Sequence, residues 1–400
     1  MYEQSHHSEE ICVSARFLLP SLITSYFVAL TPGILTRLLL LDISNTFQQP
    51  VGIMGQITTV ASLVTTISAV LMGAWSVRFN HKSLLLLGLV FCSISALGCF
   101  FALNFTMMLI AYAISGLGLG MVEPMVYTLV GAHFPLEKRV RGFGWLLTGA
   151  VLAAVSAPIM GVFASVEGWR LTFLGFILPI TLLSFIMVVK GVPSHIQSLH
   201  HANYKEKYWE GFKEIFFNRS ATSCLVGSVL AMIAWQAISL YSIAFFREYF
   251  HVSIKFASYI ILGTAICYLL GCLTSSLFVN RFGMKLITVL TIFFAGIFII
   301  AFMTVSHLGL ALSFIFLSCF FFGMRASAAS SLTLEQVPRF RGSMMSMNSA
   351  AWFLGFALGA GLGGITLLWF DYEFVGVVLG ATGIMAAVVF YLLVNDPTST

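Results

Sequence analysis

The sequence repeats one polar stretch, first as Pro135-Leu-Glu-Lys-Arg-Val-Arg-Gly142 and about 200 residues later as Val337-Pro-Arg-Phe-Arg-Gly342. Each copy ends in Arg-Gly and is followed by an apolar segment rich in glycine and alanine. A second pair, Arg78-Phe79-Asn80-His81-Lys82 and Arg281-Phe282-Gly283-Met284-Lys285, is offset by 203 residues. A repeated half-protein among apolar spans is typical of membrane transporters whose site lies between two related halves.

The composition indicates that lipid is the solvent. The chain has 400 residues, of which 59% are hydrophobic and 9% charged, whereas soluble domains have about 25% charged residues. The net charge of +5 comes from basic residues scattered among loops, which is a topology signal and excludes nucleic-acid binding. The seven cysteines lie mostly in apolar runs without C-x-x-C spacing, so we interpret them as packing residues and expect no disulfide or metal site.

Twelve apolar segments are long enough to span a bilayer, which predicts an all-α membrane protein. The first has no cleavage site of small residues, so we expect it to be retained as a helix. The predicted spans are 16–41, 51–77, 83–103, 106–131, 143–165, 170–190, 220–246, 255–279, 286–305, 308–331, 343–367 and 373–394.

The basic residues predict the orientation. The outside loops hold only Arg170, Arg247 and Lys255, and the remaining loop lysines and arginines fall inside if the N-terminus is inside. We therefore expect a multi-pass protein of the plasma membrane with both termini in the cytoplasm. The predicted domains are a six-helix bundle over 1–190, a cytoplasmic linker over 191–219 and a second six-helix bundle over 220–400.

The linker contains an amphipathic pattern. Aromatic and aliphatic residues recur every three to four positions, and lysines and glutamates fill the other face. This pattern predicts a helix on the inner leaflet, with a disordered linker as the alternative. The apolar positions are Tyr204, Tyr208, Trp209, Phe212, Ile215 and Phe216.

One loop resembles a signature of the major facilitator superfamily, and within it of the twelve-helix drug/proton antiporter-like group. The signature G-x-x-x-D-R-x-G-R-K stands here as Gly73-Ala-Trp-Ser-Val77-Arg78-Phe79-Asn80-His81-Lys82. Gly73, Arg78 and Lys82 match, and Val77 occupies the acidic position. Arg281 and Lys285 repeat the pattern in the second half. The resemblance covers essentially the whole chain and implies the two-bundle facilitator fold, with these loops controlling conformation.

The fifth span resembles the antiporter motif G-x8-G-x3-G-P-x2-G-G of the same group. It has Gly144, Ala153, Ala157-Pro158 and Gly161, with alanine partly replacing glycine. The resemblance implies antiport, with generic close packing of membrane helices as the alternative. Proline is expected to bend this helix. Arg141 and Arg341 precede this motif and its glycine-rich echo in span 343–367.

Four charged residues lie within or at the rim of spans: Arg37, Asp42, Glu123 and Arg325. A charge at mid-span costs about 2.5–3.5 kcal/mol even on lenient scales, so these residues are candidates for function. Glu123 and Arg325 have near-equivalent depths in the two halves. We predict that they face each other or a shared cavity and can pair, which makes Glu123 the candidate proton-coupling residue. A fixed structural ion pair is the alternative.

The remaining candidates line the expected cavity. Arg37 lies near the outer end of the first span, where it either attracts an anionic substrate or extends to the outer headgroups. We expect Asp42 at the water interface and a helix break at Pro32-Gly33 that borders the cavity. The other predicted substrate-binding residues are Tyr26, Gln56, Tyr127, Trp235, Gln236, Asn348 and Trp352.

These features predict a secondary transporter that exports a small amphipathic or cationic solute in exchange for protons. An organic-anion uniporter or symporter that uses Arg325 and Arg37 is the alternative, and a non-transporting membrane receptor is a third possibility. No Ser/His/Asp set, metal cluster or phosphate loop is present in the sequence, so we expect neither enzymatic activity nor a cofactor. The expected partners are a small-molecule substrate, the proton and the lipid bilayer, and we expect a monomer.

Overall fold

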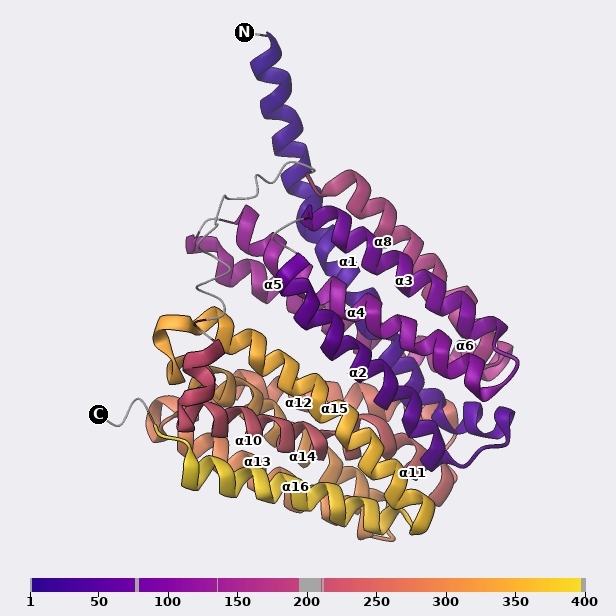
Figure 1. Cartoon of the computed structure of the whole chain (residues 1–400). Coiled ribbons are helices and arrows are strands. Elements are labelled where there is room, and N and C mark those ends of the chain that lie inside the picture. Colours follow the sequence, from indigo (N-terminus) through magenta and orange to yellow (C-terminus); the bar gives the residue numbers. More distant parts are fainter. Residues whose placement is uncertain (1, 76–78, 135, 194–209, 211, 397–400) are drawn as a thin grey trace. The chain divides into compact units, whose positions relative to one another are not determined.

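A computed structural model describes residues 2–75, 79–134, 136–193, 210 and 212–396 (Figure 1). These residues form helices and contain no strand. Twelve helical segments among them are long and apolar enough to cross a membrane, which confirms the predicted number and order. These segments are Phe17–Phe47, Val51–Met72, His81–Phe101, Phe105–Gly131, Thr148–Glu167, Trp169–Gly191, Arg219–Tyr249, Ile254–Phe282, Met284–Thr304, Leu308–Gln336, Ser343–Trp369 and Tyr372–Leu393.

The α-helices have the following bounds: α1 (Tyr2–Phe47), α2 (Val51–Trp75), α3 (His81–Phe101), α4 (Phe105–His133), α5 (Leu136–Val155), α6 (Ala157–Glu167), α7 (Trp169–Thr172), α8 (Leu178–Gly191), α10 (Arg219–Gln236), α11 (Ser242–Tyr249), α12 (Ile254–Phe282), α13 (Met284–Thr304), α14 (Leu308–Gln336), α15 (Arg341–Trp369) and α16 (Tyr372–Leu393). Two π-helical turns continue neighbouring helices, Phe173–Ile177 before α8 and Ala237–Tyr241 between α10 and α11. A short 3-10 turn, Pro338–Phe340, precedes α15.

Polar residues in the loops start several of the spans. The Asn104 side chain accepts a hydrogen bond from the Met107 backbone N–H at 2.8 Å and caps α4. Asn218 caps α10 in the same way, and Asp371 caps α16. These side chains satisfy backbone donors that the first helical turn leaves free.

The described residues form two compact units. Unit 1 lies within Met1–Thr36 and Val60–Leu199, and unit 2 lies within Arg37–Thr59 and His200–Thr400. The segment Arg37–Thr59, which joins the end of α1 to the start of α2, therefore packs with unit 2, although the sequence-based division places it in the first bundle. The predicted division into covalent halves remains a prediction.

Helix lengths and contacts support the internal repeat. Helices α3 and α13 each have 21 residues, α4 and α14 each have 29, and each pair begins 203 positions apart. In unit 1, Gly120 of α4 packs so closely on α2 that an added Cβ would lie 2.8 Å from the Thr65 carbonyl oxygen. In unit 2, Gly323 of α14 packs on the Tyr268 carbonyl of α12, and both residues are 203 positions after their counterparts. The two units therefore build the same helix contact from the same places in the repeat.

Two prolines have different effects on their helices. Helix α5 ends at Val155 and α6 begins at Ala157, with Pro158 in its first turn, so the helix is interrupted next to the proline where a bend is expected. The predicted break at Pro32-Gly33 is wrong, because α1 runs as one helix of 46 residues through both positions. Membrane helices tolerate proline where neighbouring groups take over the freed hydrogen bonds. The Thr31 hydroxyl just before Pro32 donates to the Phe27 carbonyl at 2.7 Å and adds a side-chain hydrogen bond to this turn of α1.

The close contact of Gly323 with Tyr268 in unit 2 leads to a first prediction. Replacing Gly323 by alanine puts a methyl group into the Tyr268 carbonyl, and helix backbones cannot retreat without loss of packing. We expect a loss of roughly 1–3 kcal/mol and a lower apparent Tm in detergent. The control is Gly309→Ala in the same helix, where an added Cβ meets only His307 at ordinary distances. Equal Tm values for the two variants would show that the close approach is absent.

Candidate functional site

In unit 1, three predicted residues come together around Glu123. Glu123 is half-buried on α4, and the Tyr127 hydroxyl one turn later lies within electrostatic range of its carboxyl group. The Tyr127 hydroxyl donates to the Tyr26 hydroxyl of α1 at 3.4 Å, and the two rings meet edge to face with centroids 5.9 Å apart. Within the described part of unit 1, no lysine, arginine or histidine forms an ion pair with Glu123. The carboxyl group thus lies near the Tyr127 phenol and forms no ion pair among the described residues of its own unit.

In unit 2, Arg325 on α14 is the largest fully buried side chain, with 0% of its surface exposed. In the part of unit 2 that the structure describes, none of its three guanidinium nitrogens has a hydrogen-bond partner. Its electrostatic neighbours there are Tyr268 of α12 and Cys224 of α10. Burying a cation without a partner costs far more free energy than burying a paired one. We therefore expect Arg325 to gain a partner from outside the described residues of unit 2.

Aromatic rings of α10, α12 and α14 pack against one another in the part of unit 2 that holds Arg325. Trp235 of α10 packs on Tyr268 with ring centroids 5.4 Å apart, and on Phe322 of α14 at 5.0 Å. Trp235 and Tyr268 are half-buried, so part of each ring remains accessible. Tyr268 is a site candidate that sequence reasoning missed. The signal for it is its place in the repeat, because it is the counterpart of Thr65 in the glycine contact of unit 1.

The other predicted cavity residues of unit 2 differ in how well their polar groups are satisfied. The Gln236 amide donates to the Phe356 carbonyl at 2.8 Å and accepts from Ser239, so it ties α10 to α15. Asn348 and Trp352 lie one turn apart on α15, and the Asn348 Oδ1 and Trp352 Nε1 atoms have no partner among the described residues. Both atoms are buried, so they are unsatisfied polar groups within the described part of unit 2.

Arg37 is buried, with 8% of its surface exposed, and its guanidinium donates to the Ser242 hydroxyl at 3.2 Å and the Thr264 hydroxyl at 3.4 Å. Extension of this side chain to the headgroups is therefore wrong, because the hydroxyls of α11 and α12 hold it inside unit 2. The role of Arg37 as an anion ligand remains a prediction.

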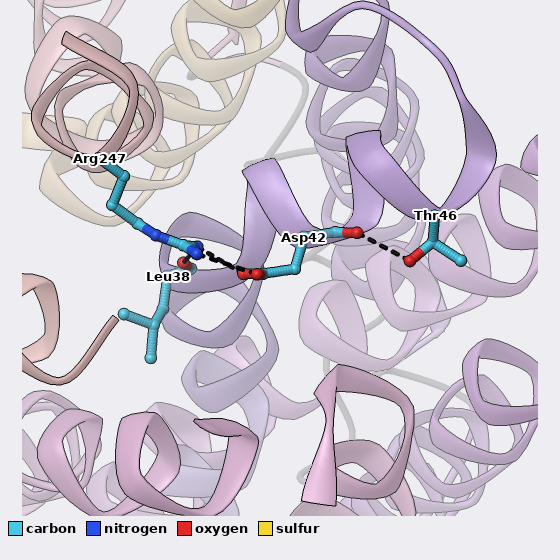
Figure 2. A network of polar contacts seen from close by, with 4 residues as sticks. All are labelled: Leu38, Asp42, Thr46 and Arg247. Carbon is cyan, nitrogen blue, oxygen red and sulfur yellow. Dashed lines mark hydrogen bonds and ion pairs between the residues drawn. The ribbon is translucent and has the colours of Figure 1, made fainter. Parts of the chain in front are cut away.

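Asp42 has a partner that the sequence did not suggest. The Arg247 guanidinium of α11 donates hydrogen bonds to both carboxylate oxygens of Asp42 (Figure 2). The distance from Nη2 to Oδ1 is 2.9 Å. The same guanidinium donates to the Leu38 carbonyl at 3.2 Å. The exposed fractions of the side chains are 13% for Arg247 and 30% for Asp42, so the pair is partly shielded from water. The sequence placed Asp42 at the water interface and Arg247 in an outside loop, but it did not indicate that the two residues pair.

The candidates outside these clusters are spread over both units. Gln56 is exposed on the segment of α2 that belongs to unit 2. The Lys82 ammonium donates to the Val189 carbonyl at 2.8 Å, in the last turn of α8. A cation at this position also interacts favourably with the helix dipole. In unit 2, the Lys285 ammonium lies 5.8 Å from the Tyr391 ring centroid, and the Arg281 guanidinium lies over Phe282.

Several predicted residues lie partly or wholly outside the described part of the chain. Gly73 and Gly161 lie in α2 and α6, and Pro158 is half-buried at the start of α6. Arg141 and Arg341 lie in α5 and α15, but their side chains are outside the described part. Arg78 and the linker residues Tyr204, Tyr208 and Trp209 lie outside the described residues. The linker positions 212–217 are helical, as expected, with Ile215 buried and Phe216 exposed.

Comparison with known proteins decides the family. The model of the Major Facilitator Superfamily matches residues 22–337 and 225–400, which together cover almost the whole chain. The chain belongs to the Major Facilitator Superfamily. A solved structure of a bacterial homologue of the human lysosomal transporter Spinster superposes with a TM-score of 0.77 and 16% identity, covering 95% of this chain and 96% of that one. This likeness confirms the facilitator fold.

Two curated relatives illustrate the range of this superfamily. The niacin transporter NiaP of Acinetobacter baylyi is 32% identical over 36% of this chain and 33% of its own length. The chloramphenicol resistance protein CraA of Acinetobacter baumannii is 26% identical over 42% of this chain and 41% of its own length. The chain thus aligns with less than half of either relative. Family and fold together identify a multi-pass membrane protein of a transporter superfamily.

The ion pair of Figure 2 makes a second prediction. Asp42→Asn and Arg247→Gln each leave one charged or polar group unpaired. We expect each to cost about 1–3 kcal/mol, between the values typical of exposed and buried pairs, and to lower the apparent Tm. The exchanged variant, Asp42→Arg with Arg247→Asp, regains part of the loss. The control is Glu373→Gln at an exposed position of α16. Single variants as stable as this control would contradict the pairing.

Proposed function

We propose that this transporter exports a small organic solute in exchange for protons by alternating access, with Glu123 carrying the proton. The observation behind the proposal is the position of Glu123: mid-span on α4, half-buried, and without a basic partner in the described part of unit 1. In the sequence, it is the only carboxyl group far from both ends of a predicted span. Intramembrane carboxyl groups of this kind commonly form proton pathways.

The physical argument concerns the two protonation states. A carboxylate surrounded by protein and lipid loses most of its hydration, whereas the neutral acid loses little. Water, or a cation brought near in one conformation, stabilises the carboxylate again. A carboxyl group that alternates between two such environments binds a proton in one and releases it in the other. Pairing with Arg325, which belongs to unit 2, is one way to supply the second environment and remains part of the proposal.

The surroundings of Glu123 suit this role. The hydroxyls of Tyr127 and Tyr26 are linked to each other at 3.4 Å, and Tyr127 lies within electrostatic range of the carboxyl group. A phenol donates a hydrogen bond to a carboxylate and accepts one from a protonated carboxyl group, so Tyr127 can serve both states. We include Tyr26 and Tyr127 in the substrate-binding or proton-transfer surface of unit 1.

We infer the direction of transport from the names of two relatives. The name of the relative CraA points to chloramphenicol resistance, which an exporter provides, and NiaP is named for niacin. Both names indicate small organic solutes, and the former supports export. We further propose a plasma-membrane monomer with both termini in the cytoplasm, because the basic residues gather in the loops expected inside.

The motif residues complete the proposal. Lys82 holds the end of α8 through the Val189 carbonyl, so the loop between α2 and α3 is tied to the last span of unit 1. Its counterpart Lys285 lies against Tyr391 of α16, the last span of unit 2. We propose that these loops, together with Arg78, Arg281, Arg141 and Arg341, keep each bundle rigid while the transporter changes conformation.

Reconstituted proteoliposomes with an acidic interior test the proton role. Radiolabelled chloramphenicol and nicotinate are the probes, and protein-free liposomes give the baseline. We expect the wild type to accumulate a probe as protons leave, and Glu123→Gln to lose this accumulation while it still exchanges labelled for unlabelled probe. Exchange without a pH gradient needs no net proton movement, so it separates coupling from binding. The control Glu167→Gln, at an exposed helix end of the same unit, keeps both activities. Accumulation by Glu123→Gln at the wild-type level would contradict the proposal.

A further inference from the structure

The helix contact that carries Arg325 does not require a charge. In unit 1, the equivalent contact joins Gly120 of α4 to Thr65 and Ser68 of α2. The residue 203 positions before Arg325 is Val122, which is also fully buried at 0% exposure. An apolar side chain thus fills the equivalent place in the same type of helix pair. The equivalent position of the repeat therefore accommodates an apolar side chain, and this type of helix contact does not depend on a guanidinium.

All three guanidinium nitrogens of Arg325 lack a hydrogen bond among the described residues of unit 2. A guanidinium is a planar fork of donors that matches a carboxylate in a bidentate arrangement. A buried fork whose donors are all vacant is what an anion-binding site presents before its ligand arrives. The partner that fits it is an anion brought by the solute.

The neighbours of Arg325 restrict the kind of anion. Among the described residues, Arg325 is the one cation that interacts electrostatically with Tyr268. A single guanidinium balances a monoanion, whereas a phosphate dianion would leave excess negative charge in an apolar site. The phenol of Tyr268, which is hydrogen-bonded to the Cys272 side chain one turn later, is a further donor that can turn to the anion. A carboxylate therefore matches the site in both charge and donors.

The aromatic rings restrict the rest of the solute. Phe322 lies one turn before Arg325 on α14 and contacts Trp235, whose ring also contacts Tyr268. Trp235 and Tyr268 are only half-buried, so their rings have surface left to cover. Flat apolar surfaces beside a charged fork favour a planar ring stacked on Trp235, with its carboxylate on Arg325.

We propose that Arg325, Tyr268 and Trp235 form a subsite for small aromatic monocarboxylates. This inference deepens the proposed transport of a small organic solute and rests on it. The solute presents its carboxylate to the vacant guanidinium and its ring to the indole of Trp235. Arg325 then has its charge compensated when the solute is bound, which couples occupancy of the site to the stability of unit 2.

The test uses the full-length protein in lipid nanodiscs and isothermal titration calorimetry. The probes are benzoate and 2-naphthoate, each compared with its neutral amide, benzamide or 2-naphthamide. We expect each acid to bind about 10-fold to 100-fold more tightly than its amide, which is the difference that a charge-assisted hydrogen bond makes. Cyclohexanecarboxylate, which has the charge without the flat ring, binds more weakly than benzoate.

Variants separate a binding role from a structural one. Arg325→Met abolishes the preference for the acid and raises the apparent Tm of the ligand-free protein, because it removes an unpaired buried charge. Arg325→Lys keeps a weaker preference, since an ammonium supplies charge without the fork. Trp235→Leu weakens benzoate binding but leaves the preference over benzamide. The control Arg339→Gln, at an exposed position of the same unit, changes neither property.

Two results would overturn the inference. One is acids that bind no more tightly than their amides. The other is a ligand-free Arg325→Met protein that is less stable than the wild type, which would show a structural ion pair, with Glu123 as the candidate partner. The proton role is tested separately. A Glu123→Gln protein that loses proton-driven accumulation but keeps the acid preference supports both proposals, and loss of the acid preference in Arg325→Met stands even if the proton role of Glu123 fails.

Discussion

The cost of holding a charge away from water governs where this chain places its ionisable groups. The bidentate pairing of Asp42 with Arg247 offsets the loss of hydration of both groups. Two hydroxyl groups offset part of this loss for Arg37. Glu123 has no basic partner in the described part of its own unit, and the nitrogens of Arg325 have no hydrogen bond in theirs. We propose that a proton, a solute or water compensates these two groups during the transport cycle.

The internal repeat separates the scaffold from the chemistry. The contact of Gly120 with Thr65 recurs as the contact of Gly323 with Tyr268, so both units rely on the same close approach of helix backbones. The side chains beside this contact differ, because Val122 stands where unit 2 has Arg325. A duplicated half thus supplies two equal frameworks, and a few substitutions at equivalent depth give one framework a carboxyl group and the other a guanidinium.

The sequence predicted the twelve spans because hydropathy is a local property that needs no knowledge of neighbours. It named Tyr26 and Tyr127 as separate substrate-binding candidates, but it did not predict their contact, which the structure shows. It failed at Pro32, because the tolerance of a membrane helix for proline depends on surrounding groups. The bond between Asp42 and Arg247 was missed for a related reason: pairing depends on helix rotation and tilt, which one sequence does not specify.

Water access to Glu123 and Arg325 tests the central claim most directly. Each residue is replaced singly by cysteine in a chain without its seven native cysteines, and the protein in liposomes is treated with a membrane-impermeant thiol reagent. Controls at the mid-span apolar surface are Ile94→Cys and Ile266→Cys, where 45% and 51% of the side-chain surface is exposed. Because the reagent attacks a hydrated thiolate, we predict reaction at 123 and 325 and none at the controls. Site cysteines as unreactive as the controls would contradict the account.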